Sequence, residues 1–185
     1  MANIRPALKI LFKLEFNNPK NALHKNEGEE GLTYKGIYQL ANPDWEGWSF
    51  VEQEIKDADG DIRRASELLY EDEFIDIVTR DLYWEKYWNP AKLDKLTSQH
   101  IANEIFIFGV NTGMETAIKK AQALVDVKAD GLIGPVTIAA INAFNEHEFD
   151  YKFDELEREH YADLIARKPS FARFKNGWMN RAKAV

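Results

Sequence analysis

The stretch from Leu23 to Ile37 reads LHKNEGEEGLTYKGI, and the interpretation of the chain starts from it. Three carboxylates, Glu27, Glu29 and Glu30, stand within four residues, where a helical pattern gives way to a glycine-punctuated, strand-like segment. A carboxylate held beside a tight turn can be partly buried and still face a cleft, which is what a general acid requires. The stretch therefore predicts a turn and a short β element that carry a candidate acid.

The composition is that of a folded, acidic protein. The 185 residues suffice for one well-packed domain or one domain with two lobes, and 45% apolar with 12% aromatic residues excludes a disordered chain. A net charge of −7 argues against a general nucleic-acid binder. The segment from Arg158 to Val185 is basic instead, with seven basic and two acidic residues. It forms either a solvated helix surface or a face toward an anionic polymer.

No cofactor or metal is expected. The chain has no cysteine, which excludes disulfides and thiolate metal sites, and no other metal-ligand spacing stands out. The acidic run at residues 57–61 is similar to a calcium loop, but its glycine is at the fourth position rather than the sixth. We therefore expect a protein that works without a metal ion.

No targeting or membrane segment is expected either. The apolar run from Ile10 to Phe12 is closed by Lys9 and Lys13, far short of a signal peptide. No segment approaches the roughly 20 apolar residues of a transmembrane helix. We expect synthesis in the cytoplasm without a signal peptide, and another route to any external target.

The elements expected along the chain are nearly all helical. Asn18-Pro19 predicts the cap and first turn of a short helix that ends near Asn26. Residues 57–61 predict the cap of one long helix, which carries on one face the apolar residues Leu68, Ile75, Val78 and Leu82. Further helices are expected over 101–110, over 117–125, from Pro135, over 149–164 and over 171–178. The fold class is all-α, α+β at most, with a small β excursion near residues 30–37.

Several motifs occur in an order that resembles one known family. Residues 27–29 read Glu-Gly-Glu, residues 31–37 read Gly-Leu-Thr-Tyr-Lys-Gly-Ile, and residues 87–88, 110–113, 121–137 and 174–181 contribute further matches. Together they resemble glycoside hydrolase family 108, the N-acetylmuramidases found among phage endolysins, in which Glu-Gly-Gly precedes Gly-x-Thr-x-x-Gly-Ile. Here Glu29 replaces the second motif glycine, and the stretch before the Gly-x-Thr segment is shorter than in the family.

The resemblance implies a fold, an activity and a partner. It implies a lysozyme-like muramidase lobe over residues 1–97 and a helical peptidoglycan-binding-like lobe over 98–185. The activity would be that of a phage or prophage endolysin, hydrolysing the β-1,4 bond between N-acetylmuramic acid and N-acetylglucosamine. Its partner would be the glycan strands of peptidoglycan and not nucleic acid. We expect a monomer that reaches the cell wall after release, with holin-dependent release as one route.

Candidate site residues follow from the motifs and from the chemistry of glycoside cleavage. Glu27 is the expected general acid. Glu29 and Glu30 compete for the role of the second catalytic group. A separation of about 5 Å from Glu27 would suit a nucleophile, and about 6.5–9.5 Å would leave room for an attacking water. Thr33 either orients a water or is an ordinary strand threonine. The expected substrate-binding residues are Tyr34, Trp84, Tyr87, Trp88 and Asn111. For the aromatic residues the alternative is the core, and for Asn111 it is a turn.

Two other functions fit the same sequence. A lytic transglycosylase uses a lone glutamate as acid and then as base, so it requires no second carboxylate. A non-catalytic wall-binding protein would keep only the segment from Asp130 to Thr137 functional, and the shortened stretch around Glu29 is consistent with it.

Overall fold

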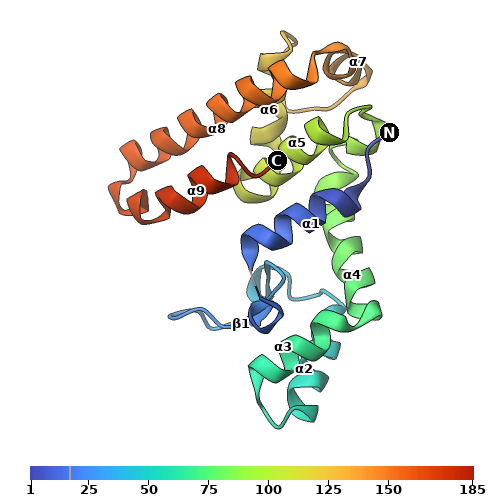
Figure 1. Cartoon of the computed structure of the whole chain (residues 1–185), viewed down its shortest axis with the longest axis vertical. Coiled ribbons are helices and arrows are strands. Elements are labelled where there is room, and N and C mark those ends of the chain that lie inside the picture. Colours follow the sequence, from blue (N-terminus) through green and yellow to red (C-terminus); the bar gives the residue numbers. More distant parts are fainter. Residues whose placement is uncertain (17) are drawn as a thin grey trace. The chain divides into compact units, whose positions relative to one another are not determined.

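The computed structural model describes residues 1–16 and 18–185, which divide into two compact units (Figure 1). The hairpin unit is Leu11–Trp84, and the helical unit is Met1–Ile10 together with Glu85–Val185. Helix α1 (Ile4–Glu15) and the π-helical turn η3 (Trp84–Trp88) each contribute residues to both units.

The hairpin unit consists of a small sheet and helices. Its elements are η1 (Pro19–Asn21), β1 (Leu23–His24), β2 (Thr33–Tyr34), β3 (Ile37–Tyr38), η2 (Gln39–Ala41), α2 (Gly47–Asp57), α3 (Ile62–Glu71) and α4 (Glu73–Tyr83). The strands form one antiparallel sheet in the order β1-β2-β3. The small β excursion predicted near residues 30–37 is thus confirmed, and the sheet also includes a strand on its N-terminal side.

The register of the sheet gives it one core face and one open face. Leu23, Tyr34 and Ile37 lie opposite one another in the pairing and are 1%, 0% and 2% exposed. Directly opposed residues of antiparallel strands share a face. His24, Thr33 and Tyr38, which are opposed to one another in the same way, must therefore lie on the other face.

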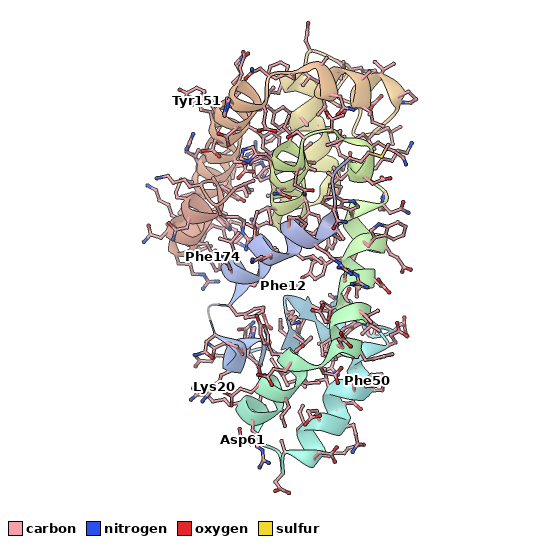
Figure 2. The ribbon with its side chains drawn as sticks, turned by 45° about the vertical axis from the view of Figure 1, so that its right-hand side comes forward. Phe12, Lys20, Phe50, Asp61, Tyr151 and Phe174 are labelled. Atoms are coloured by element: carbon pink, nitrogen blue, oxygen red, sulfur yellow. The ribbon has the colours of Figure 1, made fainter. Side chains whose placement is uncertain are left out.

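The turn between β2 and β3 is fixed by its two central residues. Lys35 and Gly36 both have positive φ, 45° and 83°, as a two-residue type I′ hairpin requires. Lys35 is nevertheless 2% exposed. Its ammonium lies 3.1 Å from Asp76 Oδ1, 5.0 Å from the ring centre of Tyr70 and 5.4 Å from that of Phe12, which is labelled in Figure 2. The hairpin turn is thus anchored to α1, α3 and α4.

The short helix expected from Asn18 to about Asn26 is wrong beyond its first turn. Asn18 does act as the cap, accepting a hydrogen bond from the backbone of Lys20, but η1 ends at Asn21. The hydroxyl of Ser66 accepts from the Leu23 backbone N–H and donates to the Pro19 carbonyl. Because Ser66 binds this N–H and β1 then pairs with β2, the chain continues as a strand.

The long helix expected after residues 57–61 is two helices. Asp61 caps α3 by accepting from the backbone N–H groups of residues 63 and 64, and Asp72 caps α4 by accepting from that of Ile75. The chain changes direction at this second cap, so Leu68 is 46% exposed while Ile75 is buried. The four apolar residues therefore do not share one face.

Helix α1 was not anticipated, although its sequence has the required pattern. Ile4, Leu8 and Leu11 recur at helical spacing and are 7%, 5% and 0% exposed. The helix ends at Glu15.

The helical unit is organised around α5. Its elements are η4 (Leu93–Lys95), α5 (Gln99–Thr112), α6 (Met114–Leu124), α7 (Pro135–Ala143), α8 (Glu146–Arg167), η5 (Pro169–Phe174) and α9 (Lys175–Arg181). All nine residues from Ile101 to Gly109 are buried, and α6 and α8 pack on α5. The Phe108 ring lies 5.7 Å from that of Phe153 and 5.9 Å from that of Tyr161 on α8. The helices expected over 101–110, over 117–125, from Pro135 and over 149–164 are confirmed, whereas the one expected over 171–178 is divided between η5 and α9.

The fold class expected from the sequence, a mostly helical protein with a small sheet, is confirmed. Across residues 1–16 and 18–185, no helix combines the length and apolar character that crossing a bilayer requires.

Candidate active site

A pocket of about 470 Å³ lies where the C-terminal end of α1 meets η1 and β1 in the hairpin unit. Its lining residues are Lys13, Leu14, Glu15, Phe16, Asn21 and His24. His24 lies on the open face of the sheet, directly opposite Thr33. The pocket therefore adjoins, at His24, the sheet face opposite the core face.

Glu15 is the carboxylate of this pocket, and a motif glycine makes room for it. A Cβ atom on Gly36 would stand 3.6 Å from Cγ and 3.7 Å from Cδ of Glu15, and 2.8 Å from the hydroxyl of Tyr83. The side chain of Glu15 thus lies against the hairpin turn, at ordinary van der Waals distance from such a Cβ atom, whereas the Tyr83 hydroxyl would be overlapped by it. Glu15 is the last residue of α1, so the structure places a carboxylate at a helix end, beside a tight turn and in a pocket.

Two polar side chains of the open sheet face accompany it. Thr33 is 8% exposed and pairs with His24 on one side and Tyr38 on the other. His24 Nδ1 lies 3.0 Å from the carbonyl oxygen of Asn21, which places a proton on Nδ1 and leaves Nε2 as the other polar atom of the ring. Of the two, only His24 lines the pocket.

The three glutamates of the opening stretch lie in the connection between β1 and β2. Gly28 has φ 81°, as expected of a turn glycine, and Glu27 and Glu30 are exposed. Glu29 is half-buried and accepts a hydrogen bond of 3.0 Å from the side-chain amide of Asn26. None of the three is among the residues that line the pocket. The expectation that Glu27 closes a helix is wrong, because the preceding residues form β1 and the connection after it.

Tyr34 does not line a cleft, contrary to expectation. It lies on the core face of the sheet, is 0% exposed, and donates a hydrogen bond of 2.9 Å to the Leu69 carbonyl. Burial raises the pKa of its hydroxyl, and the nearby carboxylates of Asp76 and Asp72 add to the effect. Tyr34 therefore helps to position the hairpin rather than to bind a ligand.

The remaining aromatic candidates differ from one another. Trp84 is 42% exposed and belongs to the hairpin unit, which leaves it available to stack on a sugar. Trp88 is 1% exposed and packs with its ring centre 5.5 Å from that of Phe106, so its expected role as a sugar platform is wrong. Tyr87 is half-buried against Phe106, and burial raises the pKa of its hydroxyl.

Asn111 is exposed near the end of α5, where its side-chain amide donates a hydrogen bond of 2.9 Å to the hydroxyl of Tyr161. Like Tyr87 and Trp88 it belongs to the helical unit, whereas the candidate acids belong to the hairpin unit. The expected site residues are thus divided between the two units.

Sequence reasoning missed Glu15, His24 as a pocket residue, and the function of Gly36. The signal that could have found Glu15 is the helical spacing of Ile4, Leu8 and Leu11, which continues to a glutamate where the pattern stops.

Comparison with known proteins supports two functional regions. Residues 22–113 match the family described as Glycosyl hydrolase 108, and residues 116–183 match the one described as Predicted Peptidoglycan domain. The first match includes Glu27 and begins after Glu15. The lobe division at residue 97 is tested by neither match and stays a prediction.

Among solved structures, SagA from Brucella abortus shares the fold, with a TM-score of 0.65 and 23% sequence identity over 96% of this chain and 88% of that chain. No curated protein matches the sequence. The two matches together show a glycosyl hydrolase 108 region over residues 22–113 followed by a peptidoglycan domain over residues 116–183.

Proposed function

We propose that this peptidoglycan hydrolase is a muramidase, cleaving the β-1,4 bond after N-acetylmuramic acid with Glu15 as its general acid. The observation that carries the proposal is the position of Glu15 at the end of α1, in a pocket and against the motif glycine Gly36. Glycoside cleavage requires a proton donor at the leaving oxygen, and a carboxyl group in a recess beside the substrate fills that role.

The rest of the pocket indicates how the second half of the reaction proceeds. Glu15 is the only carboxylate among the pocket-lining residues of the described chain. The oxocarbenium-like centre would therefore be attacked by a water rather than by a second carboxylate. Thr33 and His24, opposed on the open sheet face, are the groups proposed to orient that water. The exposed ring of Trp84 is proposed as a sugar-stacking residue.

Glu27 is the competing candidate for the acid, because it lies within the region that matches the hydrolase family. Both glutamates are exposed, and what stands against Glu27 is that it is not among the pocket-lining residues, whereas Glu15 is. We also keep Glu29 and Glu30 as alternatives for the second group, although neither lines the pocket. The roles as a phage or prophage endolysin, as a monomer and in holin-dependent release stay predictions.

A second function is favoured by the same lone carboxylate. A lytic transglycosylase uses one glutamate as acid and then as base, and forms a 1,6-anhydro end instead of adding water. Mass spectrometry of the muropeptides released from purified sacculi distinguishes the two. The proposal predicts reducing N-acetylmuramic acid ends. Anhydro ends would establish the transglycosylase, reducing N-acetylglucosamine ends would show that the other glycosidic bond is cleaved, and intact sacculi would favour a non-catalytic wall-binding protein.

A further inference from the structure

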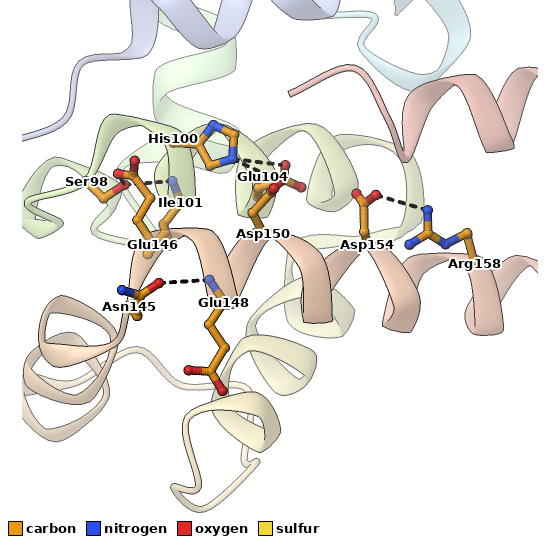
Figure 3. A network of polar contacts seen from close by, with 10 residues as sticks. All are labelled: Ser98, His100, Ile101, Glu104, Asn145, Glu146, Glu148, Asp150, Asp154 and Arg158. Atoms are coloured by element: carbon orange, nitrogen blue, oxygen red, sulfur yellow. Dashed lines mark hydrogen bonds and ion pairs between the residues drawn. The ribbon is translucent and has the colours of Figure 1, made fainter.

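A second cluster of polar side chains lies in the helical unit, between α5 and α8 (Figure 3). His100 and Glu104 are one turn apart on α5, and Asp150 faces them from α8. The Nε2 atom of His100 lies 3.0 Å from Asp150 Oδ1 and 3.8 Å from Glu104 Oε1. One ligand atom from each of the three residues lies within 4.8 Å of the others.

Glu104 is the unusual member of this cluster. Its side chain is 3% exposed, and no N–H group of the described residues makes a hydrogen bond to its carboxylate, the nearest being His100 Nε2 at 3.8 Å. Its carboxyl group instead meets that of Asp150. Two carboxyl groups in contact, one of them buried, must share either a proton or a cation, because two bare charges there would repel each other.

Neighbouring carboxylates add to the negative potential. Burial raises the pKa of Glu104, and the charges of Glu157, Asp154 and Asp150 raise it further. Arg158 pairs with Asp154 at 3.0 Å, but Glu157 is 1% exposed and its Oε2 atom has no hydrogen-bond partner. Burial and its neighbours thus disfavour the charged form of Glu104, and a cation bound beside it would favour that form.

We propose that His100, Glu104 and Asp150 bind a divalent transition-metal ion, with Zn²⁺ as the best match. One imidazole nitrogen and two carboxylate oxygens form a three-ligand set that suits Zn²⁺, whereas Ca²⁺ and Mg²⁺ prefer oxygen ligands alone. His100 and Asp150 are 31% and 40% exposed, so an ion can enter from solvent and keep a water as its fourth ligand. The ion would join α5 to α8 and stabilise the helical unit.

The test uses the full, untagged chain, freed of metal with a chelator and titrated with Zn²⁺ by calorimetry. We expect one Zn²⁺ per chain and a higher melting temperature with Zn²⁺ present. Two near-isosteric variants, Glu104→Gln and Asp150→Asn, and the ligand variant His100→Asn should each weaken binding about tenfold or more. His147→Asn is the matched control, because His147 is an exposed histidine on α8 that is not in the cluster, and it should bind Zn²⁺ like the parent.

The inference is overturned if the parent chain binds no Zn²⁺ stoichiometrically, since the two carboxyl groups then share a proton instead. It is also overturned if His100→Asn and Asp150→Asn bind as tightly as the parent. Circular dichroism of each variant without metal confirms that a loss of binding reflects the missing ligand and not unfolding.

Discussion

Replacing Gly36 by alanine tests whether the hairpin turn holds Glu15 in place. The backbone there has φ 83°, which costs an L-residue about 1–2 kcal/mol. The new methyl group would also stand 2.8 Å from the Tyr83 hydroxyl, and relieving such an overlap in a packed site costs roughly 1–3 kcal/mol. We therefore expect Gly36→Ala to lower the free energy of unfolding by about 2–5 kcal/mol.

Gly28→Ala separates the two contributions. Gly28 has φ 81°, close to that of Gly36, but its added Cβ would meet no atom within 4 Å. This control should therefore lose only the backbone part, about 1–2 kcal/mol. Urea unfolding followed by far-UV circular dichroism measures both losses. The reasoning is refuted if Gly36→Ala is no more destabilising than Gly28→Ala.

The same pair of variants reports on the site. The methyl group of Gly36→Ala would overlap the Tyr83 hydroxyl at 2.8 Å, and relieving that overlap should shift the turn against which the Glu15 side chain lies. We expect this shift to slow the solubilisation of sacculi roughly 10- to 100-fold at a temperature where the variant is folded. Adding Tyr83→Phe removes the closest atom and should restore part of the stability, which a double-mutant cycle measures against Tyr83→Phe alone. Gly28→Ala should keep its activity.

Two further predictions concern buried groups. Burial and the nearby charge of Asp154 raise the pKa of Glu157 from 4.5 to about 8, so its neutral form is favoured in the folded state and stability is lost as the pH rises from about 5 through 8. Glu157→Gln should therefore raise the free energy of unfolding by about 3 kcal/mol at pH 7. In urea titrations at pH 5, 7 and 8, the stability of this variant should fall less with rising pH than that of the parent. An unchanged dependence of stability on pH would contradict this assignment. Tyr34→Phe leaves the Leu69 carbonyl without its donor and should lower the free energy of unfolding by about 1–2 kcal/mol in the same assay. Hydrolysis by the folded variant should be unchanged. Lost activity at full stability would instead indicate that Tyr34 binds the substrate.

Local patterns predicted the parts of the fold that local interactions determine. The helix over residues 101–110 follows from a mostly apolar segment, and Gly113, with φ 94°, ends it as expected. The sheet near residues 30–37 follows from its glycines and its threonine-tyrosine pair. The strand at Leu23 could not be predicted, because it depends on the hydroxyl of Ser66, 43 residues away in the sequence.

The same distinction applies to the two candidate sites. Chemistry alone predicts a carboxylate at a helix end beside a turn, and the sequence pattern predicts that helix before Glu27, whereas the structure has a helix ending at Glu15. Only the folded hairpin shows that Gly36 leaves room for Glu15. The pairing of His100 with Asp150, 50 residues apart, likewise has no local signal, which is why no metal site was expected from the sequence.

The central claim is that Glu15 delivers the proton, and one comparison tests it most directly: the rate at which Glu15→Gln and Glu27→Gln release muropeptides from purified sacculi. Both changes keep the size and polarity of the side chain, and circular dichroism verifies that both variants fold. The account predicts that Glu15→Gln loses at least about 100-fold in rate, as expected when a general acid is removed, while Glu27→Gln stays within about twofold of the parent. Full activity in Glu15→Gln together with loss of activity in Glu27→Gln would contradict it.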